Sequence, residues 1–287
     1  MRARLAAVIA VISILAGLGQ AAASDQQFNP PKRYYLALGD SQAFGFQQAK
    51  FVHEVATHSY DPRTFNSGYV DGFAAHMLGI DPGIETVNLS CPGESSASFL
   101  GRCAFHFVRG FALHADYPGS QHAAALELLR SHHGLVSPIT IDLGSNDLRQ
   151  LWFTSCKLNP SCIAAGLPAT LDAFRANFDQ ILDDLRSASP NAEIILMQYP
   201  NPYALKAPFT TESRLALNQV IADVAATHRA RLADMYPDFN LGPQPQTLCT
   251  LTFICIAPLF DDHPTDAGYQ VMAQQFWMAS GYDRLDR

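Results

Sequence analysis

The sequence predicts an α/β protein, in which helices cover both faces of a mostly parallel sheet of about five strands to give a three-layer α/β/α sandwich. Three observations support this fold class. Short apolar runs recur along the chain, longer segments with helical periodicity separate them, and clusters of Gly, Pro and Asn mark the boundaries. Parallel neighbours need a crossover connection, usually a helix. Because the sequence shows no internal repeat and no linker, we expect residues 25–287 to form a single domain.

The strands are expected where large apolar and β-branched residues lie between turn signals. The first run, residues 34–38, stops abruptly at Gly39, and the third, residues 137–143, leads directly into Gly144. The expected strands are residues 34–38, 85–89, 137–143, 193–198 and 231–235.

The helices are expected where apolar residues recur at helical spacing. In residues 69–78, for example, Val70, Phe73, Ala74 and Met77 follow the i, i+3, i+4, i+7 pattern. Segments without clean periodicity are expected to be loops, and the first of them has room for a short helix. The expected helices are 69–78, 121–132, 167–187, 210–229 and 265–279, and the expected loops are 42–67, 152–166 and 242–258.

Residues 1–24 have the layout of a secretory signal peptide. Arg2 and Arg4 give a basic start, residues 5–19 are apolar, and residues 20–24 are mostly small. We therefore expect a secreted or extracytoplasmic protein. An uncleaved membrane anchor is the alternative, but the apolar run is short for a bilayer span.

The charge of the chain bears on its partners. Removing the two leader arginines from the 19 basic residues leaves 17 against 26 acidic ones, a formal charge of −9. That balance opposes nucleic acid and anionic membrane surfaces as partners. We expect a monomer without a stable membrane partner after leader cleavage.

All six cysteines follow the leader, and an even number in an oxidising compartment predicts disulfides. Their clustering in sequence makes sequential pairing the simplest connectivity, and none of the pairs has the two-residue spacing that zinc sites favour. The expected pairs are Cys91 with Cys103, Cys156 with Cys162, and Cys249 with Cys255.

Polar and turn residues follow three of the expected strands. Ser41 comes just after the first strand, Gly93 follows the second, and Asn146 follows the third. In open parallel sheets, reactive groups gather beyond the carboxyl ends of the strands. The sequence therefore predicts a site at this edge of the sheet.

Four short blocks resemble those of the SGNH (GDSL) hydrolases. One block alone is a weak signal, but four in the same order, across residues 33–280, are a strong one. The resemblance implies a flavodoxin-like sheet and a serine carboxylester hydrolase, an esterase or lipase, that requires no cofactor and no metal. The blocks are Gly39-Asp40-Ser41, residues 88–93, Gly144-Ser145-Asn146-Asp147 and His263-Pro264.

A serine hydroxyl needs a base to take its proton, and a tetrahedral intermediate needs donors for its oxyanion. The resemblance assigns Ser41 as the nucleophile and His263 as the general base. It assigns the oxyanion hole to the N–H groups of Ser41 and Gly93 and to the side-chain amide of Asn146.

The last block departs from the family pattern. The family usually places an aspartate three residues before the histidine, where this chain has Phe260. In an extended segment side chains alternate, so Asp261 would lie on the same side as His263, and Asp262 would face away. We therefore expect Asp261 to orient the imidazole, with Asp262 as the fallback and a backbone carbonyl as a further substitute.

Two other aspartates flank the expected catalytic residues, and we interpret both as structural. Asp40 and Asp147 are expected to hold turn backbones through Asx-type hydrogen bonds. The segment from His53 to His58 is similar to the helix of zinc proteases, but its second histidine comes one residue late, so the two imidazoles would diverge. We expect no metal site there.

Three alternative functions remain at this point. Residues 93–97 approximate the nucleophile elbow of the α/β-hydrolases, with Ser95 as nucleophile, but Ala97 stands where that turn requires glycine. The second alternative is a catalytically silent, secreted glycan-binding module of the same fold. The third is a metal-dependent hydrolase that uses the scattered histidines.

The substrate is expected to be a lipid or short-chain carboxylester, and an acetylated glycan is the alternative. Four phenylalanines lie between Phe99 and Phe111, and Trp152 and Phe153 follow the asparagine block. These aromatic side chains either line an acyl-chain groove or close the core beneath two disulfide loops.

Overall fold

The computed structural model describes residues 30–258 and 260–285, and its centre is one five-stranded sheet. The strands have the order β2-β1-β3-β4-β5, and all pairs are parallel. The predicted α/β fold with a flavodoxin-like sheet is therefore confirmed. The bounds are β1 Tyr34–Gly39, β2 Glu85–Asn88, β3 Val136–Asp142, β4 Ile194–Gln198 and β5 Arg231–Asp234.

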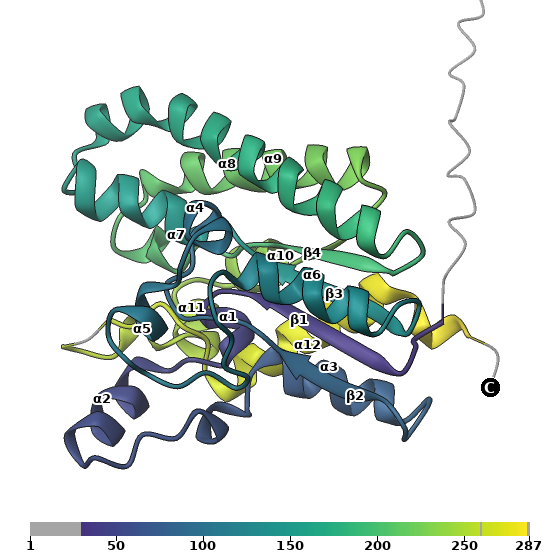
Figure 1. Cartoon of the computed structure of the whole chain (residues 1–287). Coiled ribbons are helices and arrows are strands. Elements are labelled where there is room, and N and C mark those ends of the chain that lie inside the picture. The colour runs from purple at the N-terminus through teal and green to yellow at the C-terminus, as the bar shows by residue number, and fades with distance from the viewer. Residues whose placement is uncertain (1–29, 259, 286–287) are drawn as a thin grey trace, which may run out of the picture.

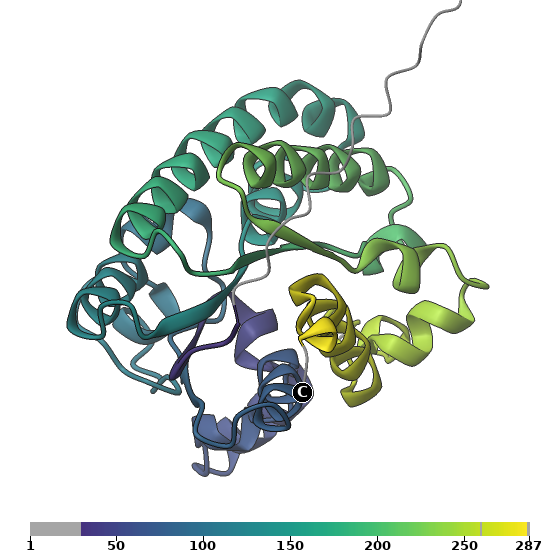
Figure 2. The same ribbon diagram turned by 90° about the vertical axis from the view of Figure 1, so that its right-hand side faces the viewer.

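Two helical layers cover the sheet, as Figures 1 and 2 show. On one face α8 packs against both α6 and α9, and on the other α3 packs against α12. Parallel strands are buried on both faces, so each of them needs this double cover. The bounds are α3 Tyr69–Leu78, α6 Gln121–Ser131, α8 Pro160–Ala188, α9 Thr210–Thr227 and α12 Asp266–Ser280.

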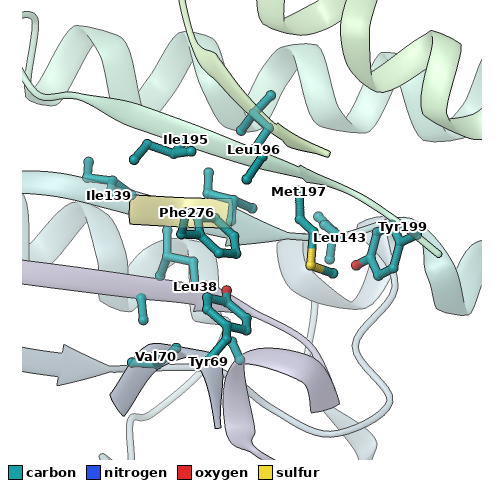
Figure 3. Close-up of a cluster of buried hydrophobic side chains, with 14 of the residues drawn as sticks. Leu38, Tyr69, Val70, Ile139, Leu143, Ile195, Leu196, Met197, Tyr199 and Phe276 are labelled. Carbon is teal, nitrogen blue, oxygen red and sulfur yellow. The ribbon is translucent and has the colours of Figure 1, made fainter. Parts of the chain in front are cut away.

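The core lies between the sheet and these helices (Figure 3). All seven residues of β3, the central strand, are buried. The rings of Tyr69 from α3 and Phe276 from α12 stack at 4.4 Å beneath the sheet, near Leu38. Burying one such large apolar side chain contributes about 1.5–3 kcal/mol.

Two sequence predictions about irregular segments were wrong. Helix α8 begins at Pro160, seven residues before the expected start at residue 167, and it continues through Pro168. Pro160 suits the first turn of a helix, and the side chain of Asn159 accepts a hydrogen bond from Cys162 N at 3.0 Å. The local cap therefore overrides the interior proline.

The expected loops at 42–67 and 242–258 also contain more helix than the sequence indicated. Their helices are too short to show clean periodicity. The short helices of the described residues are α1 Ser41–Phe44, α2 Gln48–Ala56, α4 Ser96–Leu100, α5 Ala104–Phe107, α7 Ser145–Arg149, α10 Tyr236–Asn240 and α11 Gln246–Leu251; single turns lie at Pro62–Phe65, Gln150–Ser155, Pro202–Leu205, Phe253–Cys255 and Tyr282–Arg284.

The structure pairs the cysteines sequentially, in three short-range disulfides: Cys91–Cys103, Cys156–Cys162 and Cys249–Cys255. The first closes the loop that contains Gly93, and the third closes the segment that pairs with the His263 loop. One crosslink therefore constrains a segment that carries an expected site residue, and another constrains the segment against which the His263 loop pairs.

The signal peptide predicted for residues 1–24 lies outside the described residues. Among the residues that are described, no helix is both long and apolar enough to cross a bilayer.

Candidate active site

The site forms where the strand order reverses, between β1 and β3. Gly39 ends β1 with φ +136°, and a Cβ there would lie 1.9 Å from the Asp142 Oδ1 atom of β3. Only glycine allows this approach. The Asp142 carboxylate accepts hydrogen bonds from Ala43 N at 3.2 Å and from the Tyr69 hydroxyl at 3.0 Å. It therefore links the turn after β1 to β3 and α3.

Ser41 is the first residue of α1, which starts directly after this turn. Asp40 caps the helix, because its Oδ1 accepts a hydrogen bond from Gln42 N at 2.9 Å. The Ser41 Oγ atom lies 2.9 Å from His263 Nε2, although the two residues are 222 positions apart. The fold thus brings the first and last blocks of the sequence into direct contact.

Contacts from two segments hold the loop that carries His263. Phe253 N donates to the His263 carbonyl at 3.0 Å, and Thr252 forms an antiparallel bridge with Pro264. The ring of Phe46 lies 4.9 Å from the imidazole. The imidazole is therefore fixed in position before any substrate binds.

The two candidate carboxylates point in different directions, as the expected alternation of side chains predicts. Asp261 Oδ1 lies 2.5 Å from His263 Nδ1, and its Oδ2 accepts a hydrogen bond from Gln48 N at 2.8 Å. Asp262 instead forms an ion pair with Arg149 at 2.7 Å. The structure thus places Asp261, and not Asp262, against the imidazole.

These contacts set the protonation of the site. Burial lowers the pKa of His263, but the hydrogen bond and charge of Asp261, with the charge of Asp262, outweigh it and raise the pKa above its usual value of 6.5. Burial raises the pKa of Asp261, but the hydrogen bond to His263, the charge of His263 and the hydrogen bonds from Gln48 N and His263 N together outweigh it and lower the pKa below its usual value. Asp261 is therefore a carboxylate that stabilises the imidazolium form of His263.

The predicted oxyanion donors lie beside the serine. Ser41 N belongs to the first residue of a helix, where backbone N–H groups have no partner within the helix. Gly93 is exposed, with φ +83°. The Asn146 amide donates to Asp40 Oδ2 and to the Glu94 carbonyl, both at 3.0 Å, so it also ties Glu94, beside the second block, to the turn that carries Ser41.

The family can now be assigned. The profile of the GDSL-like Lipase/Acylhydrolase family matches residues 37–271, which span the four blocks. The chain belongs to this family. As a GDSL-like protein it is a carboxylic ester hydrolase, and the predicted resemblance is confirmed. A comparison with curated proteins gave no match.

Solved structures of the same fold include three enzymes. A lipase from a goat rumen metagenome matches with a TM-score of 0.59 at 17% identity, over 88% of this chain and 99% of that chain. Phospholipase A1 from Streptomyces albidoflavus NA297 matches with 0.56 at 17%, over 86% and 99%. An acetylxylan esterase from Geobacillus stearothermophilus matches with 0.54 at 17%, over 87% and 94%. At these identities the similarity establishes the fold alone.

A buried amide network, which sequence reasoning missed, joins the first two blocks of this GDSL-like protein. Gln121, at the start of α6, accepts from Gly39 N at 2.7 Å and donates to the Gly39 carbonyl at 3.0 Å and to Glu94 Oε2 at 3.1 Å. Burial raises the pKa of Glu94 to about 7. No local pattern marks Gln121, because its role depends on where α6 packs.

Asp147 differs in detail from its expected role. Its carboxylate also reaches a distant segment, where it accepts hydrogen bonds from Ser96 N at 3.0 Å and Ser96 Oγ at 2.5 Å. It therefore fixes the start of α4 against the asparagine block. Burial raises the pKa of Asp147 above its usual value.

A cavity of about 380 Å³ opens beside Ser41 and His263. Its wall includes the aromatic rings of Phe46, Phe51 and Phe105. Of the other aromatic side chains considered for a groove, Phe99 and Trp152 are fully buried in the core. Of the residues that the sequence offered for a groove, Phe105 therefore lines the cavity, whereas Phe99 and Trp152 belong to the core.

Ser95 does not occupy the position of a nucleophile elbow. Its hydroxyl accepts a hydrogen bond from Ser98 N at 3.2 Å and caps α4. Within the described part of the chain, two groups of side chains come close enough to share a metal ion. One contains the disulfide-bonded Cys91 and Cys103, whose sulfurs are no longer thiolates, and the other is the segment 261–263 itself.

We expect Asn146→Ala to lower kcat by about 10²–10³-fold, the usual cost of removing one oxyanion donor. KM should change little, because the interaction strengthens as charge develops on the oxygen. Steady-state kinetics on a p-nitrophenyl ester measure both constants. An unchanged kcat in a variant with the wild-type melting temperature would assign Asn146 a scaffolding role alone.

Proposed function

We propose that this GDSL-like protein is a secreted, single-domain serine esterase that acts through an acyl-enzyme on Ser41. One observation carries the proposal: the continuous chain from Ser41 Oγ through His263 to Asp261, with contacts of 2.9 and 2.5 Å. This is the arrangement in which a base activates a hydroxyl and a carboxylate orients the base. The three disulfides are compatible with secretion.

In the first half of the reaction, Ser41 Oγ attacks the ester carbonyl carbon, and His263 Nε2 takes the hydroxyl proton. Asp261 stabilises the imidazolium that forms. Three donors stabilise the oxyanion: the N–H groups of Ser41 and Gly93 and the side-chain amide of Asn146. Because the amide hydrogens of Asn146 already contact Asp40 Oδ2 and the Glu94 carbonyl, one of these hydrogens is shared between its present acceptor and the oxyanion. The intermediate then collapses, and the imidazolium returns the proton to the leaving alkoxide as the alcohol departs.

In the second half, water replaces the alcohol in the same cavity. His263 takes a proton from this water, whose oxygen attacks the acyl carbon. Collapse of the second intermediate releases the carboxylic acid and returns the proton to Ser41 Oγ. The side chains account for every proton transfer, so the proposed mechanism needs no cofactor.

The aromatic wall of the cavity favours a lipid or short-chain carboxylester as the substrate. Phe46 and Phe105 are nearly fully buried and present ring surface to the cavity beside the nucleophile. An acyl chain can replace water on that surface, with a gain of about 0.8 kcal/mol for each buried CH₂ group. The alternative, an acetylated glycan, would use polar contacts around a single small acyl group.

Two measurements test the proposal. A fluorophosphonate probe should label the protein at Ser41, as peptide mapping of the adduct would show; a folded protein that resists the probe would instead support a silent binding module. The second measurement compares substrates: rates on p-nitrophenyl esters should rise as the acyl chain becomes longer than acetyl. Release of acetate from acetylated xylan, measured beside them, tests the glycan alternative. Activity that disappears with chelators would support a metal-dependent hydrolase.

The pH dependence follows from the raised pKa of His263. The general base must be neutral, so kcat/KM should rise with pH through this pKa, with a midpoint above 6.5. Asp262→Asn should move the midpoint to lower pH, because it removes an anion that raises the pKa of His263. A pH–rate profile of kcat/KM for both proteins checks the direction, and a midpoint well below 6.5 in the wild type would contradict it.

A further inference from the structure

The residues at the rim of the cavity are exposed to solvent, whereas those of its aromatic wall are buried. Val52, Ala104 and Arg109 all line the cavity, and all three are exposed. Phe46 and Phe105, which line it too, are buried and therefore lie deeper. An ester that places its acyl chain against the rings would leave its alcohol part near the rim.

Most of the charged side chains around this cavity already have partners. Asp40 accepts from Gln42 N and the Asn146 amide, and Asp262 pairs with Arg149. The guanidinium of Arg149 also contacts the Tyr203 hydroxyl and lies over the rings of Phe153 and Tyr203. Asp262 and Arg149 thus neutralise one another, and Asp40 is held by neutral hydrogen-bond donors.

Arg109 is different. Across residues 30–258 and 260–285, no hydrogen bond or ion pair is found for its guanidinium. Its neighbour Val108 is 80% exposed, and Val52, on the same rim, is 49% exposed. Arg109 therefore stands as an unpaired cation among apolar side chains, on a protein whose formal charge is −7.

An unpaired guanidinium at the rim of the cavity can bind an anionic group of a ligand. The overall negative charge repels anions at long range, but salt screens charges beyond about 10 Å at moderate ionic strength, so the nearest charge dominates at the rim. A guanidinium offers a planar fork of donors that matches phosphate and carboxylate oxygens. The combination of a buried apolar wall with a cation at the opening suits a substrate that is apolar at one end and anionic at the other.

We propose that the natural substrates are acyl esters whose alcohol part carries an anionic group, a phosphate or a carboxylate, and that Arg109 binds this group at the rim of the cavity. The inference rests on the proposed function, because it names the substrate class of that same site. It assigns to Arg109 a role in specificity and leaves the roles of Ser41, His263 and Asp261 unchanged.

Two matched substrate pairs test it. In the first, 1-hexanoylglycerol is compared with 1-hexanoylglycerol 3-phosphate; in the second, the hexanoyl ester of 3-hydroxypropanamide is compared with that of 3-hydroxypropanoate. Each pair differs in charge at one group, and the chains are short enough to keep the substrates in free solution. The measured quantity is the ratio of kcat/KM for the anionic ester to kcat/KM for its neutral partner.

In the wild type, we expect a ratio of about ten in at least one pair, the size of one charge-assisted hydrogen bond. The pair with the larger ratio identifies phosphate or carboxylate as the preferred group. Arg109→Gln, which keeps a polar side chain but removes the charge, should bring the ratio close to one, and Arg109→Lys should retain the larger part of it. Added salt should reduce the wild-type ratio.

Arg102→Gln is the matched control. Arg102 is an exposed arginine seven positions earlier, packs over the ring of Phe107 and does not line the cavity, so its replacement should leave the ratio unchanged. A wild-type ratio near one in both pairs would overturn the inference. So would an unchanged ratio in Arg109→Gln, or an equal fall in both glutamine variants. None of these results touches the proposed function, which fails if ester hydrolysis persists in Ser41→Ala or if none of the four esters is hydrolysed.

Discussion

Replacing Ser41 by alanine is expected to lower kcat on a p-nitrophenyl ester by at least about 10⁴-fold. The substitution removes the atom that forms the acyl-enzyme and leaves His263 without the hydroxyl it contacts at 2.9 Å. The fold should survive, because alanine is smaller and α1 keeps its cap from Asp40. Steady-state kinetics and a melting curve measure the two properties separately.

Ser95→Ala is the matched control for this variant. Ser95 lies next to the second block but caps α4, so its loss should cost about 1 kcal/mol of stability and little activity. If esterase activity disappeared in Ser95→Ala and persisted in Ser41→Ala, the nucleophile would have to be reassigned to the second block.

The second largest effect is expected for Asp261→Asn, which should lower kcat/KM by about 10³–10⁴-fold. An asparagine amide can donate to Nδ1, which would stabilise the tautomer that carries its proton on Nε2 and cannot accept one from Ser41. It also removes the charge that stabilises the imidazolium. The substitution keeps the size of the side chain, and its oxygen can still accept the hydrogen bond from Gln48 N.

Asp262→Asn distinguishes this role from a general effect of negative charge. Asp262 pairs with Arg149, and its carboxylate makes no hydrogen bond to the imidazole among the contacts of the described residues. We expect its loss to reduce kcat/KM by less than about tenfold, which corresponds to 1.4 kcal/mol. Equal losses for the two asparagine variants, measured at the pH optimum of each, would rule out a special role for Asp261.

Local sequence patterns accounted for the sheet and its main helices. The helix predicted at residues 69–78 agrees with α3 at both ends, and the strand runs coincide with β1 to β5 within about two residues, the usual uncertainty of such boundaries. The start of α8 could not be found in the same way. Pro168 signals a boundary, whereas the cap at Asn159 that fixes the true start is a weaker pattern.

Some residues of the candidate site could likewise be predicted from local sequence patterns, and others could not. Ser41, His263 and Asn146 could be named as candidates because each stands in a short block whose spacing is visible in the chain. The choice between Asp261 and Asp262 followed from the alternation of an extended segment, and the structure shows where each carboxylate lies. Gln121 and Arg109 could not be named, because an isolated glutamine or arginine has no distinguishing neighbours in sequence.

By itself, the sequence determined which segments become strands and helices and which residue types stand at the ends of the strands, because periodicity and turn chemistry act over a few neighbouring residues. Only the tertiary structure decided that Ser41 and His263 touch across 222 positions, that Gln121 joins Gly39 to Glu94, and that Arg109 lines the cavity. Such contacts depend on how distant elements pack together, and local sequence patterns do not encode packing directly.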